Sequence, residues 1–191
     1  MLSFQEKKAT VQIPRSIPRN ESDTLAKWRE GYESLTGQTV MVLEQCVYGD
    51  LFRFVTANGA LQQQPKLLKY LFLQVCQGLR DLHLVTSMAH LDIKLENVLV
   101  ADDGTLKLCD FGLAQPLDAD LTKSQGTEVY MAPEVEAASL SNPYRGLPAD
   151  IFAMGVLLWN LYFAAPPFAR ASSSDRNFSV LQRCPDMFWR L

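Results

Sequence analysis

The chain has 191 residues, of which 48% are hydrophobic and 20% are charged, and its formal net charge is −3. This length suits one domain of ordinary size, and the composition allows a real hydrophobic core and argues against disorder of the whole chain. The charge balance lacks the basic footprint of a nucleic-acid binder, so no nucleic-acid partner is expected.

The first 38 residues are polar and weakly patterned, and their prolines argue against a long helix. No long apolar run stands near the N-terminus, so no signal peptide is expected. Residues 25–34 are compatible with a strand, and Thr36-Gly37 with a turn after it. The stretch TVMVLEQC, residues 39–46, is rich in β-formers and predicts a buried strand.

Two helices are predicted next. The first follows a break at residues 47–50 and spans about 50–59, with Asp50 as its candidate N-cap and Gly59 at its end. The second spans residues 65–85, and Pro65 suits its first turn. Its apolar residues recur at helical spacing and form one broad face. They are Leu67, Leu68, Leu71, Phe72, Val75, Leu79 and Leu82.

A β-hairpin is predicted after these helices. The segments NVLV at 97–100 and TLKLC at 105–109 are rich in β-formers, and Asp103-Gly104 lies between them. An Asp-Gly pair between such runs is a strong hairpin signal. Residues 110–148 have little periodicity and are expected to form a long functional loop.

The stretch from Ile151 to Ala169 contains no charged residue. Such a stretch is typical of a core helix of a globular protein or of a helix in contact with a membrane. Pro166 and Pro167 shorten the helix, so the sequence favours a core helix from about Pro148 to Ala165, and no membrane partner is expected. We expect this helix to be the most buried element of the fold.

The cysteines are far apart and never form a C-x-x-C pair. With His83 and His90 as the only histidines, neither a zinc site nor a disulfide framework is expected. A reduced, cytoplasmic location is therefore the default expectation. The four cysteines are Cys46, Cys76, Cys109 and Cys184.

Residues 90–100, HLDIKLENVLV, concentrate polar side chains on one loop: the carboxylate of Asp92, the ammonium group of Lys94 and the amide of Asn97. Asp110 follows directly after the hairpin, and a hairpin brings its ends together, so Asn97 and Asp110 are expected to be neighbours. Their oxygen atoms suit Mg²⁺, which leaves its other positions to phosphate and water. Lys94 would then face a phosphoryl group, and Asp92 would take or orient a hydroxyl proton.

This order of residues resembles that of the protein kinase family. Residues 126–134 look like the substrate-binding segment of its serine/threonine branch, and residues 148–159 look like the start of its central large-lobe helix. Residues 40–52 look like the last small-lobe strand, the hinge and the entry to the large lobe. The H-R-D-type catalytic loop is matched by His90, Asp92, Lys94 and Asn97, D-F-G by Asp110, Phe111 and Gly112, and A-P-E by Ala132, Pro133 and Glu134.

The resemblance implies a catalytic role for each matching residue. Asp92 would be the catalytic base, and Lys94 would stabilise the γ-phosphoryl group of ATP and point to serine/threonine specificity. Thr127 would bond both of them. Asn97 and Asp110 would hold Mg²⁺.

The resemblance also implies a nucleotide site at the hinge. Glu44 and Cys46 would offer backbone groups to adenine, Asp50 would lie near the ribose, and Leu99 would pack beneath the adenine ring. Asp150 would fasten the catalytic loop through its backbone amides.

The chain departs from the family pattern in four ways. No Gly-rich phosphate loop is present, since only Gly31 and Gly37 precede Gly49. No V-A-I-K-like lysine strand is present. The sequence ends before the last large-lobe helices, which usually supply the arginine partner of Glu134. Leu91 replaces the arginine of H-R-D.

The replacement at Leu91 bears on regulation. An arginine at this position pairs with a phosphate on the loop, whereas leucine cannot and is expected to be buried. Phosphorylation of Thr122 or Ser124 is therefore expected to have little effect on the order of the loop.

The predicted fold class is α+β, a protein-kinase-like fold with a mainly helical large lobe, a short catalytic hairpin and one or two small-lobe strands. Residues 1–38 would be a small-lobe remnant and residues 39–191 the kinase domain. The predicted function is transfer of the γ-phosphate of ATP to Ser/Thr hydroxyls of a protein substrate, with Mg²⁺. The alternative is a catalytically silent kinase-like fragment that acts as a binding module.

Overall fold

The computed structural model describes residues 28–33 and 39–188, so the predicted turn at Thr36-Gly37 and residues 1–27 lie outside the described residues. The strands are β1 (Trp28–Glu33), β2 (Thr39–Leu43), β3 (Met88–Ala89), β4 (Val98–Val100), β5 (Leu106–Leu108) and β6 (Gln115–Pro116). The α-helices are α1 (Leu51–Asn58), α2 (Pro65–Asp81), α3 (Pro133–Glu136), α4 (Gly146–Phe163), α5 (Arg176–Arg183) and α6 (Pro185–Phe188).

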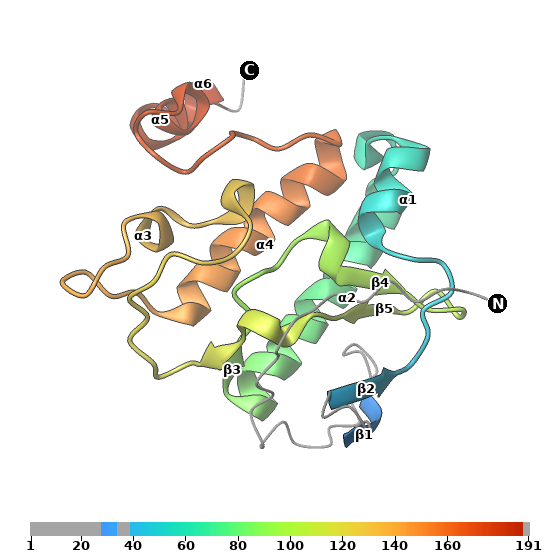
Figure 1. The fold of residues 1–191 in the computed structure, drawn as a ribbon. Helices are drawn as coiled ribbons and strands as arrows, with labels where there is room; N and C mark the ends of the chain where they lie inside the picture. Colours follow the sequence, from blue (N-terminus) through green and yellow to red (C-terminus); the bar gives the residue numbers. More distant parts are fainter. Residues whose placement is uncertain (1–27, 34–38, 189–191) are drawn as a thin grey trace.

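Helices dominate the fold, and the strands of the described residues form three separate antiparallel pairs: β1 with β2, β3 with β6, and β4 with β5. Figure 1 shows the long helices α2 and α4 running through the molecule, with the β4–β5 hairpin beside α2. The predicted α+β class, with a helical majority and few strands, is confirmed.

The two predicted N-terminal strands are present as β1 and β2. They pair in antiparallel register, with Tyr32 opposite Val40 and an irregularity between Trp28 and Glu30. The prediction of a buried strand is wrong at Leu43, whose side chain is 44% exposed. A run of β-formers indicates extended backbone, but its burial depends on what packs over it.

The predicted limits of α1 and α2 are confirmed by their caps. Asp50 caps α1 by accepting a hydrogen bond from the Arg53 backbone at 2.8 Å, and Gly59, at φ 78°, ends the helix. Pro65 opens α2, which continues through a π-helical turn, Leu82–Thr86, to Ser87 in the left-handed conformation. The broad apolar face of α2 packs on the hairpin and on α4.

Helix α4 begins at Gly146, two residues before the predicted start, and this position has no room for a side chain. A Cβ atom at Gly146 would lie 2.4 Å from the Cβ of Ala89, so α4 approaches β3 more closely than any larger residue allows. The helix ends at Phe163, and its C-cap residue Ala164 has the left-handed conformation, ahead of Pro166. Leu157 and Leu161, both 0% exposed, place α4 in the main core.

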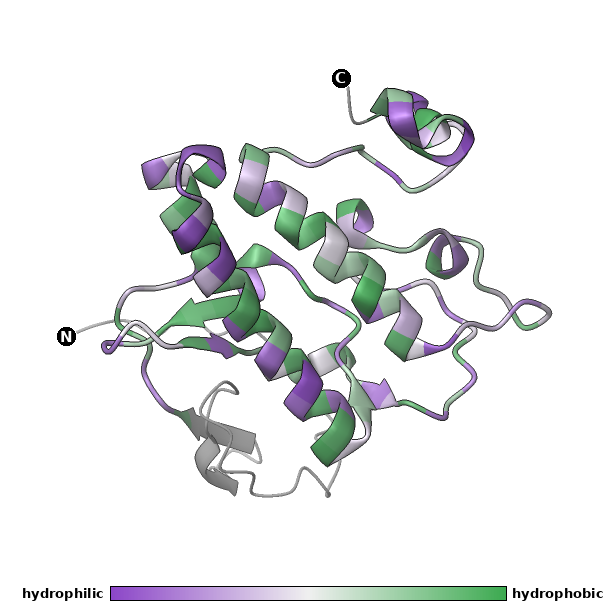
Figure 2. Ribbon diagram, turned by 180° about the vertical axis from the view of Figure 1, so that it is seen from behind, coloured by the Kyte–Doolittle hydropathy of each residue, from purple (hydrophilic) through white to green (hydrophobic). Residues whose placement is uncertain are grey.

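Only part of α4 is buried. It has the largest buried share of the described α-helices, but Ile151 is 57% exposed and Tyr162 is 38% exposed. The expectation that α4 is the most buried element is therefore wrong, since strand β5 is buried at every position. By length and composition α4 could also cross a membrane. Half of its residues are buried inside the protein, however, as in a core helix. Figure 2 shows its hydrophobic colouring on more than one side.

Candidate active site

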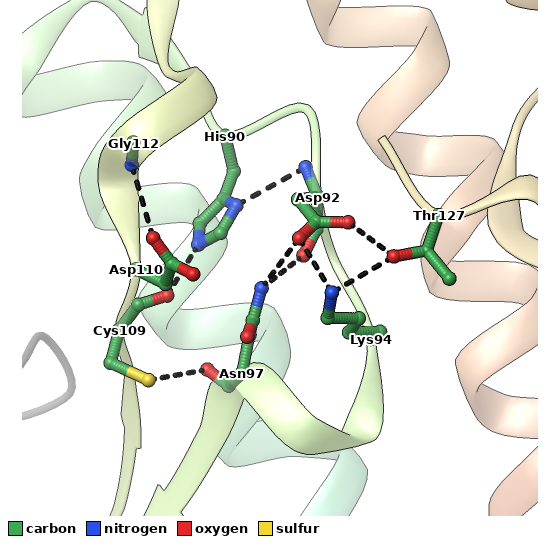
Figure 3. A network of polar contacts seen from close by, with 8 residues as sticks. All are labelled: His90, Asp92, Lys94, Asn97, Cys109, Asp110, Gly112 and Thr127. Carbon is green, nitrogen blue, oxygen red and sulfur yellow. Dashed lines mark hydrogen bonds and ion pairs between the residues drawn. The ribbon is translucent and has the colours of Figure 1, made fainter. Parts of the chain in front are cut away.

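The candidate catalytic loop, residues 90–97, runs from β3 to β4. The β4–β5 hairpin then returns the chain beside the loop, because Val98 pairs with Leu108 and the Cys109 amide donates to the Asn97 carbonyl at 3.0 Å. The hairpin therefore brings residues 92–97 next to residues 109–112, and Figure 3 shows the two segments side by side.

The loop is fastened to α4 through one buried carboxylate. Asp150, 1% exposed, accepts the backbone N–H groups of His90 and Leu91, each at 2.8 Å. The Nε2–H of His83 donates to the same carboxylate at 2.8 Å. Burying a carboxylate is costly unless donors compensate it, and three donors do so here. The role predicted for Asp150 agrees with these contacts, and His83 has a structural role.

His90 orients the backbone of the catalytic loop. Its Nε2 lies 3.0 Å from the carbonyl of Cys109, which can only accept, so Nε2 carries the proton. Nδ1 then accepts the N–H of Asp92 at 3.3 Å. Burial lowers the pKa of His90, which keeps the ring neutral in this tautomer. The ring of Phe111 packs against it, with centroids 5.2 Å apart.

Three donors converge on the carboxylate of Asp92. Thr127 donates its hydroxyl to Oδ1 at 2.7 Å, and Lys94 Nζ donates to Oδ2 at 2.7 Å. Asn97 Nδ2 donates to Oδ2 at 3.0 Å and to the Asp92 carbonyl at 2.8 Å. Lys94 also donates to Thr127 Oγ1 at 2.9 Å. The catalytic residues predicted from the sequence, Asp92, Lys94 and Thr127, therefore form one network (Figure 3).

This network keeps Asp92 ionised. Burial alone would raise the pKa of the carboxyl group, but the hydrogen bonds from Lys94, Thr127 and Asn97 outweigh burial and hold the pKa below its usual value. An ionised carboxylate, with Lys94 beside it, can accept a proton from a hydroxyl group.

Asp110 stands at the other side of the loop in a left-handed conformation, at φ 61°, and accepts the N–H of Gly112 at 3.4 Å. The preceding residue, Cys109, donates its backbone N–H to the Asn97 carbonyl. Asp110 therefore directly follows a residue bonded to Asn97, in line with the expectation that Asn97 and Asp110 are neighbours. Burial and the nearby Asp110 raise the pKa of the Cys109 thiol to about 12, so this cysteine is an inert, neutral filler.

The residues predicted to hold Mg²⁺ have suitable donor chemistry. The amide nitrogen of Asn97 is engaged by Asp92, which leaves its oxygen as the remaining ligand atom. Asp110 adds a carboxylate. No group of three or more His, Cys, Asp or Glu that could hold a metal occurs among the described residues. Two oxygen ligands fit Mg²⁺ that arrives with phosphate, since this ion is usually bound by one or two protein ligands plus phosphates.

The predicted nucleotide residues lie around the segment between β2 and α1. Asp50 and Leu99 are paired by an antiparallel bridge, so the structure brings these two together. The Cys46 carbonyl accepts the N–H of Gly49 at 3.3 Å. The side chain of Glu44 points into an ion pair with Lys107 at 3.1 Å. The adenine and ribose contacts of these residues remain predictions.

Several residues at the site were missed by sequence reasoning. Lys107, 7% exposed, ties the hairpin to Glu44, and its place in an apolar run gave the only signal. Gly126, at φ 111°, has no room for a side chain, because a Cβ atom would lie 2.6 Å from the Leu91 carbonyl. Arg170 pairs with Glu128 and with Glu136, and no local pattern announces these contacts.

Leu91 lies where the H-R-D pattern has arginine. It is 8% exposed, as expected, in an apolar cluster with Ala89, Val135 and Tyr144, and its backbone is left-handed at φ 65°. Glu134 makes no ion pair within the described part of the chain, whereas Glu136 pairs with Arg170 at 3.1 Å.

Comparison with known proteins agrees with this geometry. Residues 19–190 match the protein kinase domain family. The chain is 34% identical over 176 residues to the serine/threonine-protein kinase ksp1 of Schizosaccharomyces pombe, an alignment that covers 88% of this chain and 37% of that protein. It is 33% identical over 164 residues to the serine/threonine-protein kinase Nek1 of Mus musculus, covering 84% of this chain and 13% of that protein.

A third relative is the maternal embryonic leucine zipper kinase of Danio rerio, 37% identical over 152 residues, with 78% of this chain and 21% of that protein covered. The chain spans less than half the length of these curated relatives. The family match extends over nearly the whole chain, and the resemblance seen in the motifs is confirmed: the chain belongs to the protein kinase family.

Proposed function

We propose that the chain catalyses transfer of the γ-phosphate of ATP to serine or threonine hydroxyl groups of proteins. The observation that supports this most directly is the ionised carboxylate of Asp92, held by Lys94 at 2.7 Å and by Thr127 at 2.7 Å. Phosphoryl transfer needs little covalent chemistry from the protein, and a base, a cation and positioning groups are the parts that this site supplies.

Each residue has a role in this reaction. The substrate hydroxyl gives its proton to Asp92 while its oxygen bonds to the γ-phosphorus, and the bond to the β-phosphate oxygen breaks to release ADP. Lys94 offers its positive charge to the transferred group. Thr127 holds the substrate-binding segment against the base through its hydrogen bond to Asp92.

Bound Mg²⁺ would neutralise the phosphate charge, held by Asp110 and Asn97. Backbone groups of Glu44 and Cys46 would meet the adenine, with Asp50 near the ribose and Leu99 beneath the ring. We place this activity in the cytoplasm, where ATP and Mg²⁺ are available and where the four free cysteines stay reduced.

The test is phosphate transfer from labelled ATP to a mixture of unstructured Ser/Thr-containing peptides. Asp92→Asn is expected to lose activity about a thousandfold, because an amide cannot accept the hydroxyl proton. Asp186→Asn removes an exposed carboxylate of α6 and is the matched control. An Asp92→Asn protein with activity equal to that control would contradict the role of Asp92.

A second candidate is a kinase-like binding module without turnover. The observation that favours it is that neither Trp28–Glu33 nor residues 39–50 contain a lysine, and no G-x-G-x-x-G occurs upstream of Gly49. In kinases these parts position the β- and γ-phosphates. Calorimetry combined with the phosphate-transfer assay distinguishes the two candidates. A binding module would bind ATP in an Mg²⁺-dependent way that Asp110→Asn weakens, yet it would transfer no phosphate in the assay above.

A further inference from the structure

The segment between β6 and Thr127 is fastened to the two residues that precede α4. We call residues 117–125 the loop segment; the two residues before α4 are Tyr144 and Arg145. Leu121 and Tyr144 exchange both backbone hydrogen bonds, at 3.0 and 2.8 Å. Figure 1 shows the yellow loop segment passing beside the N-terminal end of α4.

Arg145 holds the loop segment at two points. Its Nη2 pairs with the Asp120 carboxylate at 2.9 Å, and its Nη1 donates to the carbonyl of Asp118. A planar guanidinium can satisfy a side chain and a backbone group at the same time, whereas a lysine ammonium group acts as a point charge.

Tyr144 holds the same segment from the inside. Its side chain is 4% exposed and packs in the apolar cluster that contains Leu91. Its hydroxyl donates to the Lys123 carbonyl at 3.3 Å. Burial raises the pKa of Tyr144, so the hydroxyl keeps the proton that it donates.

These contacts occupy the place of a missing regulatory interaction. Where a loop phosphate orders a kinase, it does so by pairing with arginine side chains. Leu91 cannot take part, because its apolar side chain is buried under the loop segment and carries no charge. Arg145, which lies beside the loop segment, already has a negative partner in Asp120.

We propose that Tyr144 and Arg145 order the loop segment without phosphorylation, with Asp120 as the permanent anion that Arg145 binds. Order in the loop segment reaches the active site through Gly126, which lies against the Leu91 carbonyl, and Thr127, which bonds Asp92 at 2.7 Å. Tyr144 and Arg145 are therefore positioning residues. Their importance for activity rests on the proposed kinase function, whereas their effect on loop order does not.

Hydrogen exchange followed by mass spectrometry tests this in the 191-residue chain. The informative amide is that of Leu121, which donates to the Tyr144 carbonyl. Arg145→Ala is expected to speed exchange in residues 117–125 about fivefold, the size expected for one hydrogen-bonded surface ion pair. The exchange rate in Arg145→Lys should lie between those of the wild-type chain and Arg145→Ala. Tyr144→Phe should speed exchange near Lys123.

Two controls make the result decisive. Arg80→Ala removes an exposed arginine of α2 that makes no ion pair among the described residues, and exchange should not change. Amides of β4 and β5, followed in the same experiment, show whether the fold persists. Phosphatase treatment of the wild-type chain should leave exchange in the loop segment unchanged.

Unchanged exchange in Arg145→Ala, relative to Arg80→Ala, would overturn the proposal. So would a loop segment that exchanges faster after phosphatase treatment, since that would assign its order to phosphate at Thr122 or Ser124. The exchange experiment needs no catalysis, so failure of the proposed kinase function would appear separately, as absence of phosphate transfer by the wild-type chain.

Discussion

The catalytic loop and the segment that faces it are both attached to α4, but by opposite kinds of contact. The catalytic loop is attached through Asp150, whose carboxylate is 1% exposed and bonds two backbone amides at 2.8 Å. Residues 118–136 are held in part by the buried Tyr144 and in part by two arginines that flank α4. Arg145 and Arg170 are 50% and 51% exposed, and their partners Asp120 and Glu128 are 65% and 52% exposed.

The difference separates a fixed part from an adjustable part. A hydrogen bond to a buried charge acts in a medium of low dielectric and leaves an unsatisfied group if it is broken. A half-exposed ion pair is weakened by water and salt and can be exchanged for hydration at little cost. The catalytic-loop backbone held by Asp150 is therefore the fixed part, while the ion pairs of Arg145 and Arg170 can open without unfolding of the core.

The largest expected effect on stability is at Asp150, which attaches the catalytic loop to α4. Asp150→Ala leaves two buried backbone donors and His83 without an acceptor, and we expect it to lower the free energy of unfolding by about 3–5 kcal/mol. Urea denaturation measures this. His83→Ala removes only one of the three donors and should cost less. An Asp150→Ala loss below about 1 kcal/mol would mean that the buried carboxylate is not the main attachment.

A smaller effect is expected from titration of Asp92. Its pKa is lowered in the folded protein, so the ionised carboxylate stabilises the fold. This contribution is complete above about pH 5, begins to fall near the unfolded value of about 3.9, and is lost as the pH falls through the lower pKa of the folded protein. The difference in unfolding free energy between the wild-type chain and Asp92→Asn should therefore shrink on acidification.

The measurement is urea denaturation of both proteins from about pH 6 to about pH 3 at constant ionic strength. Titration of the other carboxylates is common to both proteins and cancels in the difference. A difference that stays constant or grows on acidification would show that Asp92 is not held ionised by Lys94, Thr127 and Asn97.

The sequence predicted the parts of the fold that local patterns determine. The hairpin followed from Asp103-Gly104 between two runs of β-formers, and the limits of α1 followed from Asp50 and Gly59. These signals act over a few residues, so they do not depend on the rest of the fold. The pairing of Thr127 with Asp92 joins residues far apart in the chain and came only from the family motifs.

The features that were missed depend on tertiary packing. The exposed side of α4 at Ile151 could not be predicted, because a charge-free helix shows no periodicity that would separate its faces. The exposure of Leu43 could not be predicted either, since a β-rich run does not show what packs over it. The arginine contacts join charges with no regular spacing, so only the folded chain brings them together.

The smallest effect on stability is expected at Arg170, one of the two half-exposed arginines that hold residues 118–136. Arg170 donates through Nε to Glu136 at 3.1 Å and also pairs with Glu128, which directly follows Thr127. Because Arg170 and Glu128 are half exposed, Arg170→Ala should lower the free energy of unfolding by less than about 1 kcal/mol.

Urea denaturation at low salt and at about 1 M salt tests this, since the Debye length falls to about 3 Å at the higher concentration. The loss in Arg170→Ala should shrink with salt. Arg176→Ala, which removes an exposed arginine of α5 with no ion pair among the described residues, should show neither loss nor salt dependence. If Arg170→Ala lowered the free energy of unfolding by more than about 2 kcal/mol at both salt concentrations, the Arg170 contacts would be as rigid as those of Asp150. The residues around Thr127 would then be held as firmly as the catalytic loop, and the contrast between the two attachments would not hold.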